Sequence, residues 1–291
     1  MQTIVQACIV GVLLGGVYAL MSSGLTLVFG IMRVINVAQG AFVILAAYLS
    51  FSLFRDAHID PFLSILILVP AMFALGVATQ LVFIRSLRSD LGTEMSLLVT
   101  WALALGIEGA LSVAYSTSAR VSLTSYADKS WSLGSYRFPQ PRVYAFGVSI
   151  LILIVLYLLL RYSRFGRSIR AVVQNVSSAQ LLGVEPKWVS ALGFGIGAST
   201  AAAAGAVYGV IYPFNPGSHY DLISRLLSII VLGGLGSVGG AIVAALLMGV
   251  VESIVAVEVS PTWAAFSFFL VLIAVLLVRP QGLFGIRERA L

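Results

Sequence analysis

The stretch LLSIIVLGGLGSVGGAIVAALLMGVVESIVAV (Leu226–Val257) decides how this chain folds. Its 32 residues are nearly all apolar or glycine, and one straight helix of them would be about 48 Å long. That length exceeds the roughly 30 Å hydrocarbon core of a bilayer. Glycine is a poor helix former that permits turns. Five glycines interrupt the stretch: Gly233, Gly234, Gly236, Gly239 and Gly240. We therefore predict a short segment, Leu222–Gly236, followed by a membrane span, Gly239–Val257.

The rest of the chain has the same character. Of its 291 residues, 60% are hydrophobic and only 10% are charged, against about 25% charged in a soluble domain. Such a chain cannot cover its core with polar surface, which excludes disorder and a water-soluble fold. Seven further spans of suitable length are expected: Ala7–Phe29, Asn36–Phe54, Phe62–Ile84, Met95–Tyr115, Val143–Leu160, Trp188–Tyr212 and Thr262–Val278. The predicted fold is all-α, a polytopic bundle of eight full spans plus one short or glycine-broken segment, forming a single domain over residues 1–291.

Lysine and arginine positions predict the orientation of the bundle. With the N-terminus outside and nine crossings, eleven of these residues lie inside and six outside. The bias disappears if Leu222–Gly236 does not cross, so a crossing is favoured. The net charge is +6. We expect the basic residues to orient the chain in the membrane and to contact anionic lipid headgroups rather than to bind nucleic acid.

Two loops are long enough to have their own structure. Residues 116–142 are polar and predict an outer cap in which weak alternation allows a short hairpin. Residues 161–187 are basic and predict an inner loop, and helical periodicity over Ser168–Leu182 predicts an amphipathic helix. Such a helix either lies on lipid or docks a partner, and periodicity does not choose between them.

Several kinds of chemistry are missing from the residue inventory. The two histidines, His58 and His219, both fall in predicted outer loops, and Cys8 is the single cysteine, so neither a metal cluster nor an internal disulfide is expected. A nucleotide-binding P-loop needs Gly-Lys-Ser/Thr. The two lysines, Lys129 and Lys187, follow Asp and Pro instead. If transport is driven by ATP, another subunit must supply the nucleotide site.

Acidic residues inside spans are functional candidates because each costs about 2.5–3.5 kcal/mol at mid-helix. Glu108 and Glu252 are the two such residues, and Arg225 begins the short segment that precedes Glu252. One hypothesis pairs Glu252 with Arg225. The alternative places Glu252 near the outer headgroups, facing water.

Polar residues along the first, second and fourth spans are further candidates for a translocation pathway. Ser22, Thr26 and Thr100 are also explained by hydrogen bonding between helices, worth about 0.6 kcal/mol each. Asn36 and Gln39 open the second span, where free N–H groups at a broken helix could hold a carboxylate. An ordinary N-cap at the membrane surface is the alternative.

Together these motifs resemble the permease subunits of bacterial ABC importers for branched-chain amino acids, over nearly the whole chain. GVYALMSSGLTLVFGIMRVINVAQGAF (Gly16–Phe42) is similar to the family's opening span, which ends in Asn-x-Ala-His-Gly-Glu. The matching positions are Asn36, Ala38 and Gly40. Gln39 and Ala41 depart from the His and Glu, so a substrate contact at those two positions would differ here.

A second resemblance concerns the basic loop. RYSRFGRSIRAVVQNVSSAQLLGV (Arg161–Val184) looks like the family's cytoplasmic loop that contacts the ATPase subunit, which favours a docking role. The residues implied at that contact are Arg164, Gly166, Arg167, Arg170, Ala171, Gln174, Asn175, Ala179 and Gly183. Val231–Ser253 resembles the family's glycine-rich stretch, and RPQGLFG (Arg279–Gly285) its C-terminal motif. With the polar residues above, Gly233, Gly234, Gly236 and Glu252 complete the pathway candidates.

The resemblance implies a complex in the bacterial inner membrane. Its other members would be a second homologous permease, ATP-binding subunits inside and a periplasmic substrate-binding protein, and this chain would hold no cofactor. ATP-driven closure would push on Ser168–Leu182, with the glycine break as a hinge or a backbone lining. The alternatives are the same machine carrying urea or short amides, a self-sufficient facilitator, or an ion-coupled transporter that uses its intramembrane acids.

Overall fold

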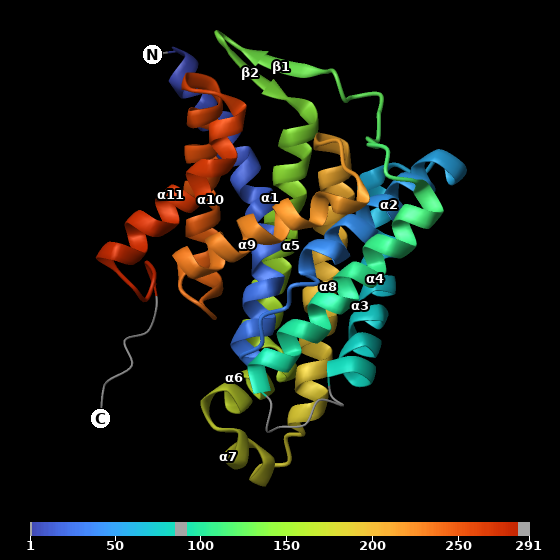
Figure 1. The fold of residues 1–291 in the computed structure, drawn as a ribbon, viewed down its shortest axis with the longest axis vertical. Helices are drawn as coiled ribbons and strands as arrows, with labels where there is room; N and C mark the ends of the chain where they lie inside the picture. Colours follow the sequence, from blue (N-terminus) through green and yellow to red (C-terminus); the bar gives the residue numbers. More distant parts are fainter. Residues whose placement is uncertain (1, 85–91, 285–291) are drawn as a thin grey trace.

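The computed structural model describes residues 2–84 and 92–284, which form a bundle of helices with one small β-hairpin (Figure 1). The long helices are α1 (Gln2–Met32), α2 (Gln39–Ala57), α3 (Pro61–Thr79) continued by the π-helical turn η1 (Gln80–Ile84), α4 (Gly92–Tyr115), α5 (Gln140–Tyr162), α8 (Pro186–Ile211), α10 (Val238–Glu258) and α11 (Pro261–Val278). In the described part of the chain, eight helices are long and apolar enough to cross a membrane. The all-α polytopic fold with eight full spans is thereby confirmed.

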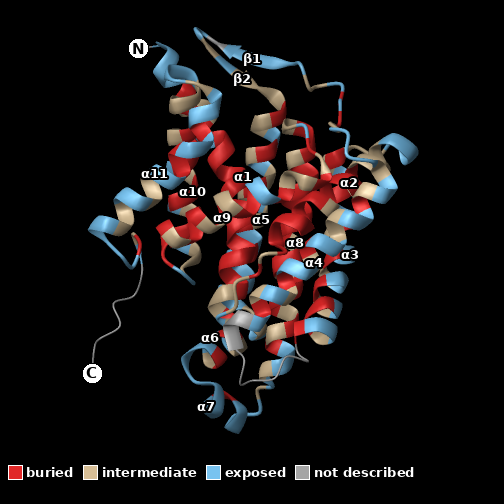
Figure 2. Cartoon of the chain, in the orientation of Figure 1, coloured by how far each residue is buried: buried red, intermediate tan, exposed pale blue. Residues whose placement is uncertain are grey.

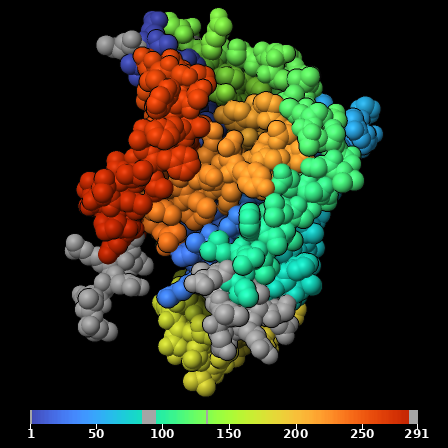
Figure 3. All heavy atoms as spheres, viewed as in Figure 1, coloured from blue at the N-terminus to red at the C-terminus, as the bar shows by residue number. Residues whose placement is uncertain are grey.

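The ninth element is α9 (His219–Gly233), which has 15 residues and is too short to be a full span. It lies obliquely to its neighbours, running from the end of α8 towards the start of α10 (Figure 1). Its side chains reach the surface between those of α11 and α4 (Figure 3). This agrees with a short segment interrupted by the glycines, although α9 spans His219–Gly233 rather than the predicted Leu222–Gly236.

The two long loops lie at opposite ends of the bundle (Figure 1). At one end, β1 (Ser130–Leu133) pairs antiparallel with β2 (Tyr136–Pro139), forming the hairpin that alternation allowed. Tyr126 ties this loop to the start of α3 by donating a hydrogen bond to Asp60 at 2.8 Å. Burial and this hydrogen bond raise the pKa of Tyr126, so its hydroxyl stays a donor at any working pH. At the other end lie α6 (Arg164–Gln174) and α7 (Val176–Leu181).

The centre of the bundle is formed by α1 and α8, the two most buried spans (Figure 2). Small residues let their backbones approach neighbours closely. A Cβ on Gly249 of α10 would lie 2.5 Å from the carbonyl oxygen of Gly11 in α1. A Cβ on Gly205 of α8 would lie 2.2 Å from the carbonyl oxygen of Val43 in α2. These contacts admit no side chain, which explains the density of small residues in both helices.

Three sequence-based expectations are wrong in detail. Ser168–Leu182 is not one helix, because Asn175 is extended and its side chain caps α7 by accepting from the Ser178 amide at 2.9 Å. The second span begins at Gln39 rather than Asn36, since residues 33–38 are not helical. His219 is not in an outer loop: it begins α9 and is 1% exposed.

Candidate functional site

The basic loop folds back onto the end of the bundle. Ser163 caps α6, because its hydroxyl accepts a hydrogen bond from the Gly166 amide at 2.9 Å. Gly166 has no room for a side chain, since a Cβ there would lie 2.0 Å from the carbonyl oxygen of Leu160. Ile169 and Val172 bury the apolar face of α6 against residues at the ends of α1, α5 and α8. A force on α6 therefore acts directly on three membrane helices.

The residues expected at an ATPase contact fall into two groups. Gly166 and Ala179 are buried and hold the loop in shape, while Ala171 is half-buried. The exposed members are Arg164, Arg167, Arg170, Gln174, Asn175 and Gly183. Beside them Leu181 and Leu182 are 89% and 82% exposed. Sequence reasoning counted Leu182 in the apolar periodicity of one amphipathic helix and did not single out Leu181, although two adjacent leucines just before a glycine were a visible signal.

The connection between α9 and α10 packs backbone against backbone. A Cβ on Gly240 would lie 2.1 Å from the carbonyl oxygen of Gly233. Gly234 and Gly236 have φ angles of 95° and 83°, which side chains disfavour. Gly236 also faces Gly30 near the end of α1, where a Cβ on it would lie 3.6 Å from the Gly30 Cα atom. The predicted break is thus a compact turn that lies against α1. It consists of residues 234–237 and is here named the glycine turn.

The start of α2 lies inside the bundle. The Gln39 side chain is fully buried and donates to the carbonyl of Gly197, in the middle of α8, at 3.1 Å. Asn36 is 1% exposed and donates to the Gln39 oxygen at 3.4 Å. Thr100 of α4 accepts from the Val37 amide at 3.3 Å. Asn36 Oδ1 is buried without a hydrogen-bond partner among the described residues. Non-helical backbone here is buried in protein, as the membrane requires.

Ser22 and Thr26 satisfy their hydroxyls within their own helix. Ser22 donates to the carbonyl of Ala19 at 3.2 Å, and Thr26 to that of Ser22 at 2.7 Å. The expected hydrogen bonding between helices is therefore wrong for these two residues. It holds for Thr100, which joins α4 to the segment before α2.

A buried ion pair joins four helices. Arg225 of α9 contacts Glu252 of α10, which confirms the pairing inferred from the cost of an intramembrane charge. Tyr18 of α1 donates to Glu252 at 2.8 Å and accepts from Arg225 at 2.9 Å. The Arg225 guanidinium also lies 5.4 Å from the ring centre of Phe268 in α11. Glu252 is 9% exposed, so it does not face open water.

Glu252 also lines a cavity of about 360 Å³, here named the Glu252 cavity. Arg142, at the start of α5, and Tyr212, at the end of α8, line the same space. Aliphatic side chains form much of its wall: Ala7, Val10, Leu14, Ala256, Val257 and Ala264. A carboxylate and a guanidinium thus meet an apolar surface near the hairpin end of the bundle.

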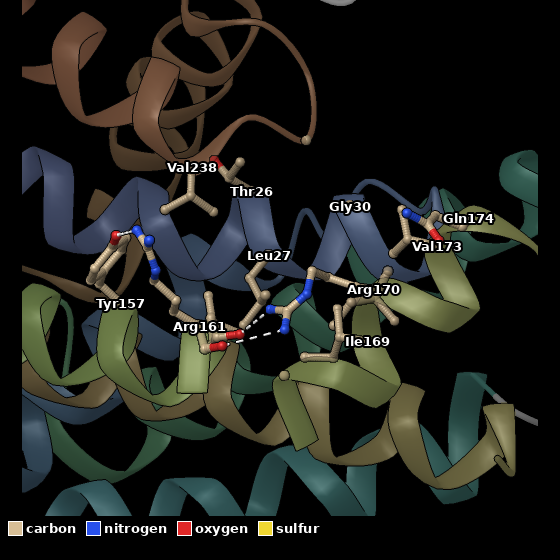
Figure 4. Close-up of a pocket in the computed structure, with 14 residues that line it drawn as sticks. Thr26, Leu27, Gly30, Tyr157, Arg161, Ile169, Arg170, Val173, Gln174 and Val238 are labelled. Atoms are coloured by element: carbon tan, nitrogen blue, oxygen red, sulfur yellow. Dashed lines mark hydrogen bonds between the residues drawn. The ribbon is translucent and has the colours of Figure 1, made fainter. Parts of the chain in front are cut away.

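A second cavity, of about 460 Å³, lies at the opposite end and is here named the α6 cavity. Thr26 and Gly30 of α1, Arg161 of α5, Arg170 of α6 and Gly236 of the glycine turn all line it (Figure 4). The remaining lining residues are Leu27, Ile31, Tyr157, Leu160, Gly166, Ile169, Val173, Gln174 and Val238. The structure therefore brings pathway candidates and coupling candidates around one space.

Glu108, the second intramembrane acid, also has partners. Its carboxylate lies 3.1 Å from His219 Nε2 and accepts from the Tyr220 hydroxyl at 2.9 Å. These contacts hold α4 against the start of α9. Sequence reasoning missed the pair because His219 is 111 residues away. The signal available was the cost of leaving an acid unpaired inside a span.

Comparison with known proteins gives a consistent result. Residues 8–276 match the family described as the permease component of branched-chain amino acid transport systems. The chain is 31% identical over 289 residues to the high-affinity branched-chain amino acid transport system permease protein LivH of Salmonella typhimurium LT2, covering 94% of this chain and 93% of that relative. LivH of Escherichia coli K12 gives the same figures. BraD of Pseudomonas aeruginosa PAO1 is 28% identical over 293 residues, covering 96% and 95%. No solved structure gives a significant match.

Proposed function

The chain belongs to the permease family of branched-chain amino acid transport systems, and from that premise we propose that it is a membrane-spanning subunit of an ATP-driven importer in the bacterial inner membrane. Its partners are ATP-binding subunits at the α6–α7 end, a second homologous permease and a periplasmic substrate-binding protein at the hairpin end. In this proposal the ATP-binding subunits carry out the hydrolysis, and this chain contributes the membrane path without a cofactor. Within the described residues, no group of His, Cys, Asp and Glu could hold a metal ion.

The observation that carries this proposal is the placement of α6. Its apolar face is packed on α1, α5 and α8, while Arg164 and Arg167 remain exposed for a partner. The same helix shares the α6 cavity with Gly236 of the glycine turn. ATP-driven movement of a partner against the 161–187 loop would therefore reach the membrane helices and the glycine turn without crossing a flexible linker.

The Glu252 cavity favours an amino acid as cargo. A zwitterion needs a cation for its carboxylate and acceptors for its ammonium group. Arg142 supplies the cation, and Glu252, although it is paired with Arg225, has further lone pairs to accept from the ammonium group. The aliphatic wall suits an aliphatic side chain. Urea and short amides carry no charge, so they would form hydrogen bonds but no ion pair with either group. The cargo we propose is a branched-chain amino acid or a close relative, entering from the hairpin end.

Co-purification tests whether the chain assembles with ATP-binding subunits. The chain is expected to retain its ATP-binding subunits through gentle purification, and the Leu181→Glu/Leu182→Glu variant to lose them. Leu123→Glu is the matched control, because Leu123 is 72% exposed but lies in the 116–142 loop. A facilitator or an ion-coupled transporter would retain uptake in the α7 variant. Uptake of labelled leucine without ATP-binding subunits would contradict the proposal.

Competition between solutes for uptake tests which cargo is carried. Leucine uptake, in a host lacking its own systems, should be inhibited by isoleucine and valine and not by urea or acetamide. Arg142→Gln should weaken uptake of the amino acid while the complex stays intact. Inhibition by urea as strong as that by isoleucine would refute the cargo and leave the importer itself standing.

A further inference from the structure

We propose that the α6 cavity binds one anionic phospholipid of the inner leaflet, with its phosphate on Arg161 and Arg170 and an acyl chain against the apolar wall. This inference relies on the orientation in the proposed function, and not on its cargo.

The two arginines are cations without carboxylates. Among the described residues, the ion pairs are Arg55–Asp56, His219–Glu108 and Arg225–Glu252, and no acidic side chain lines the α6 cavity. Both residues are exposed, and a pair of guanidinium groups beside an apolar space suits an anionic ligand.

Both guanidinium groups are held in place by neutral partners. Arg170 donates to the carbonyl oxygens of Leu160 at 2.5 Å and Arg161 at 3.3 Å, as Figure 4 shows. Arg161 donates to the Tyr157 hydroxyl, and its guanidinium lies 5.7 Å from the ring centres of Tyr157 and Tyr162. A guanidinium has five N–H donors. These contacts orient the two groups and leave donors free for phosphate oxygens.

The wall of the cavity favours an amphiphile over a free anion. It consists mainly of aliphatic side chains from α1, α5, α6 and α10: Leu27, Ile31, Leu160, Ile169, Val173 and Val238. Inorganic phosphate would leave this surface in contact with water. An acyl chain would cover this surface and remove it from water.

The position of the cavity matches the headgroup level of a leaflet. Arg161 lies in the last turn of α5 and Gly30 in the last turn of α1, at the end of the bundle that carries the basic loop. Tyr157 and Leu158, one turn back on α5, are about half exposed, as lipid-facing side chains would be. Basic pockets between membrane helices on the cytoplasmic side are suited to anionic headgroups.

Native mass spectrometry of the full chain in detergent tests the site, with phosphatidylglycerol and phosphatidylcholine as the probes. The wild type should hold one phosphatidylglycerol and bind phosphatidylcholine much more weakly. Arg161→Gln/Arg170→Gln should lower the affinity for phosphatidylglycerol by tenfold or more. The matched control, Arg164→Gln/Arg167→Gln, removes the same charge from the same loop outside the cavity and should bind like the wild type.

A second variant keeps both arginines. Val173→Trp fills the cavity and should also abolish binding, and it decides the question if the double arginine variant does not fold. Equal binding by the two arginine double variants, equal binding of the two lipids, or full retention by Val173→Trp would overturn the site. These results are independent of uptake and of co-purification, so a failure here is distinguishable from failure of the proposed function.

Discussion

Replacing Glu252 by Gln tests the buried ion pair most directly, because the variant keeps the shape of the side chain and removes only its charge. Arg225 then stays buried as an unbalanced cation, with a side chain 22% exposed. Removing one partner of a buried pair costs about 3–5 kcal/mol. The Tyr18 hydroxyl and the Phe268 ring still contact the guanidinium. We therefore expect the lower figure, a loss of about 3 kcal/mol in the free energy of unfolding.

Thermal unfolding of the purified chain measures this loss. For a chain of this size, about 3 kcal/mol corresponds to a fall of about 5 °C in the unfolding midpoint. The matched control is Asp56→Asn, which removes one carboxylate from the solvent-exposed Arg55–Asp56 pair and should leave the midpoint unchanged. The charge swap Glu252→Arg/Arg225→Glu should recover both midpoint and uptake relative to either single variant. An unchanged midpoint in Glu252→Gln, or a swap no better than the single variants, would refute the reasoning.

Three further predictions concern the close packing at Gly240 and Gly166 and the contacts of Glu108. Gly240→Ala should abolish uptake and lower the unfolding midpoint, because the new Cβ would overlap the main-chain carbonyl of Gly233. The control is Gly239→Ala, which has open space around its Cβ and should behave like the wild type in the same assays. Gly166→Ala should displace α6 from α5, so fewer ATP-binding subunits should co-purify with the chain although it still inserts into the membrane. Co-purification of these subunits at the wild-type level would contradict the role given to this close packing. Glu108→Ala should lower the unfolding midpoint, because it removes the carboxylate that lies 3.1 Å from His219 Nε2 and accepts from the Tyr220 hydroxyl, and an unchanged midpoint would show that these contacts do not hold α4 to α9.

The membrane spans were predictable from local sequence because the bilayer imposes its condition on each span separately. About twenty consecutive residues must be apolar wherever the chain crosses, so all eight full spans were found in the hydropathy pattern. The break in the glycine-rich stretch was equally local, since glycine acts through its own backbone freedom, although the helix ends at Gly233 and not at the predicted Gly236. The Glu252–Arg225 pair followed from the cost of a buried charge as one of two alternatives, and the structure decided between pairing and exposure to water.

Only the tertiary structure decided which distant segments meet. Asn175 ends a helix that its periodicity would continue, because its side chain caps the next helix. Glu108 and His219 are 111 residues apart, and no pattern in either span specifies the other. The α6 cavity exists because α1, α6 and the glycine turn converge. Hydropathy records how each residue interacts with the lipid solvent, whereas a cavity or an ion pair depends on the relative placement of helices, which is fixed by packing contacts across the whole bundle.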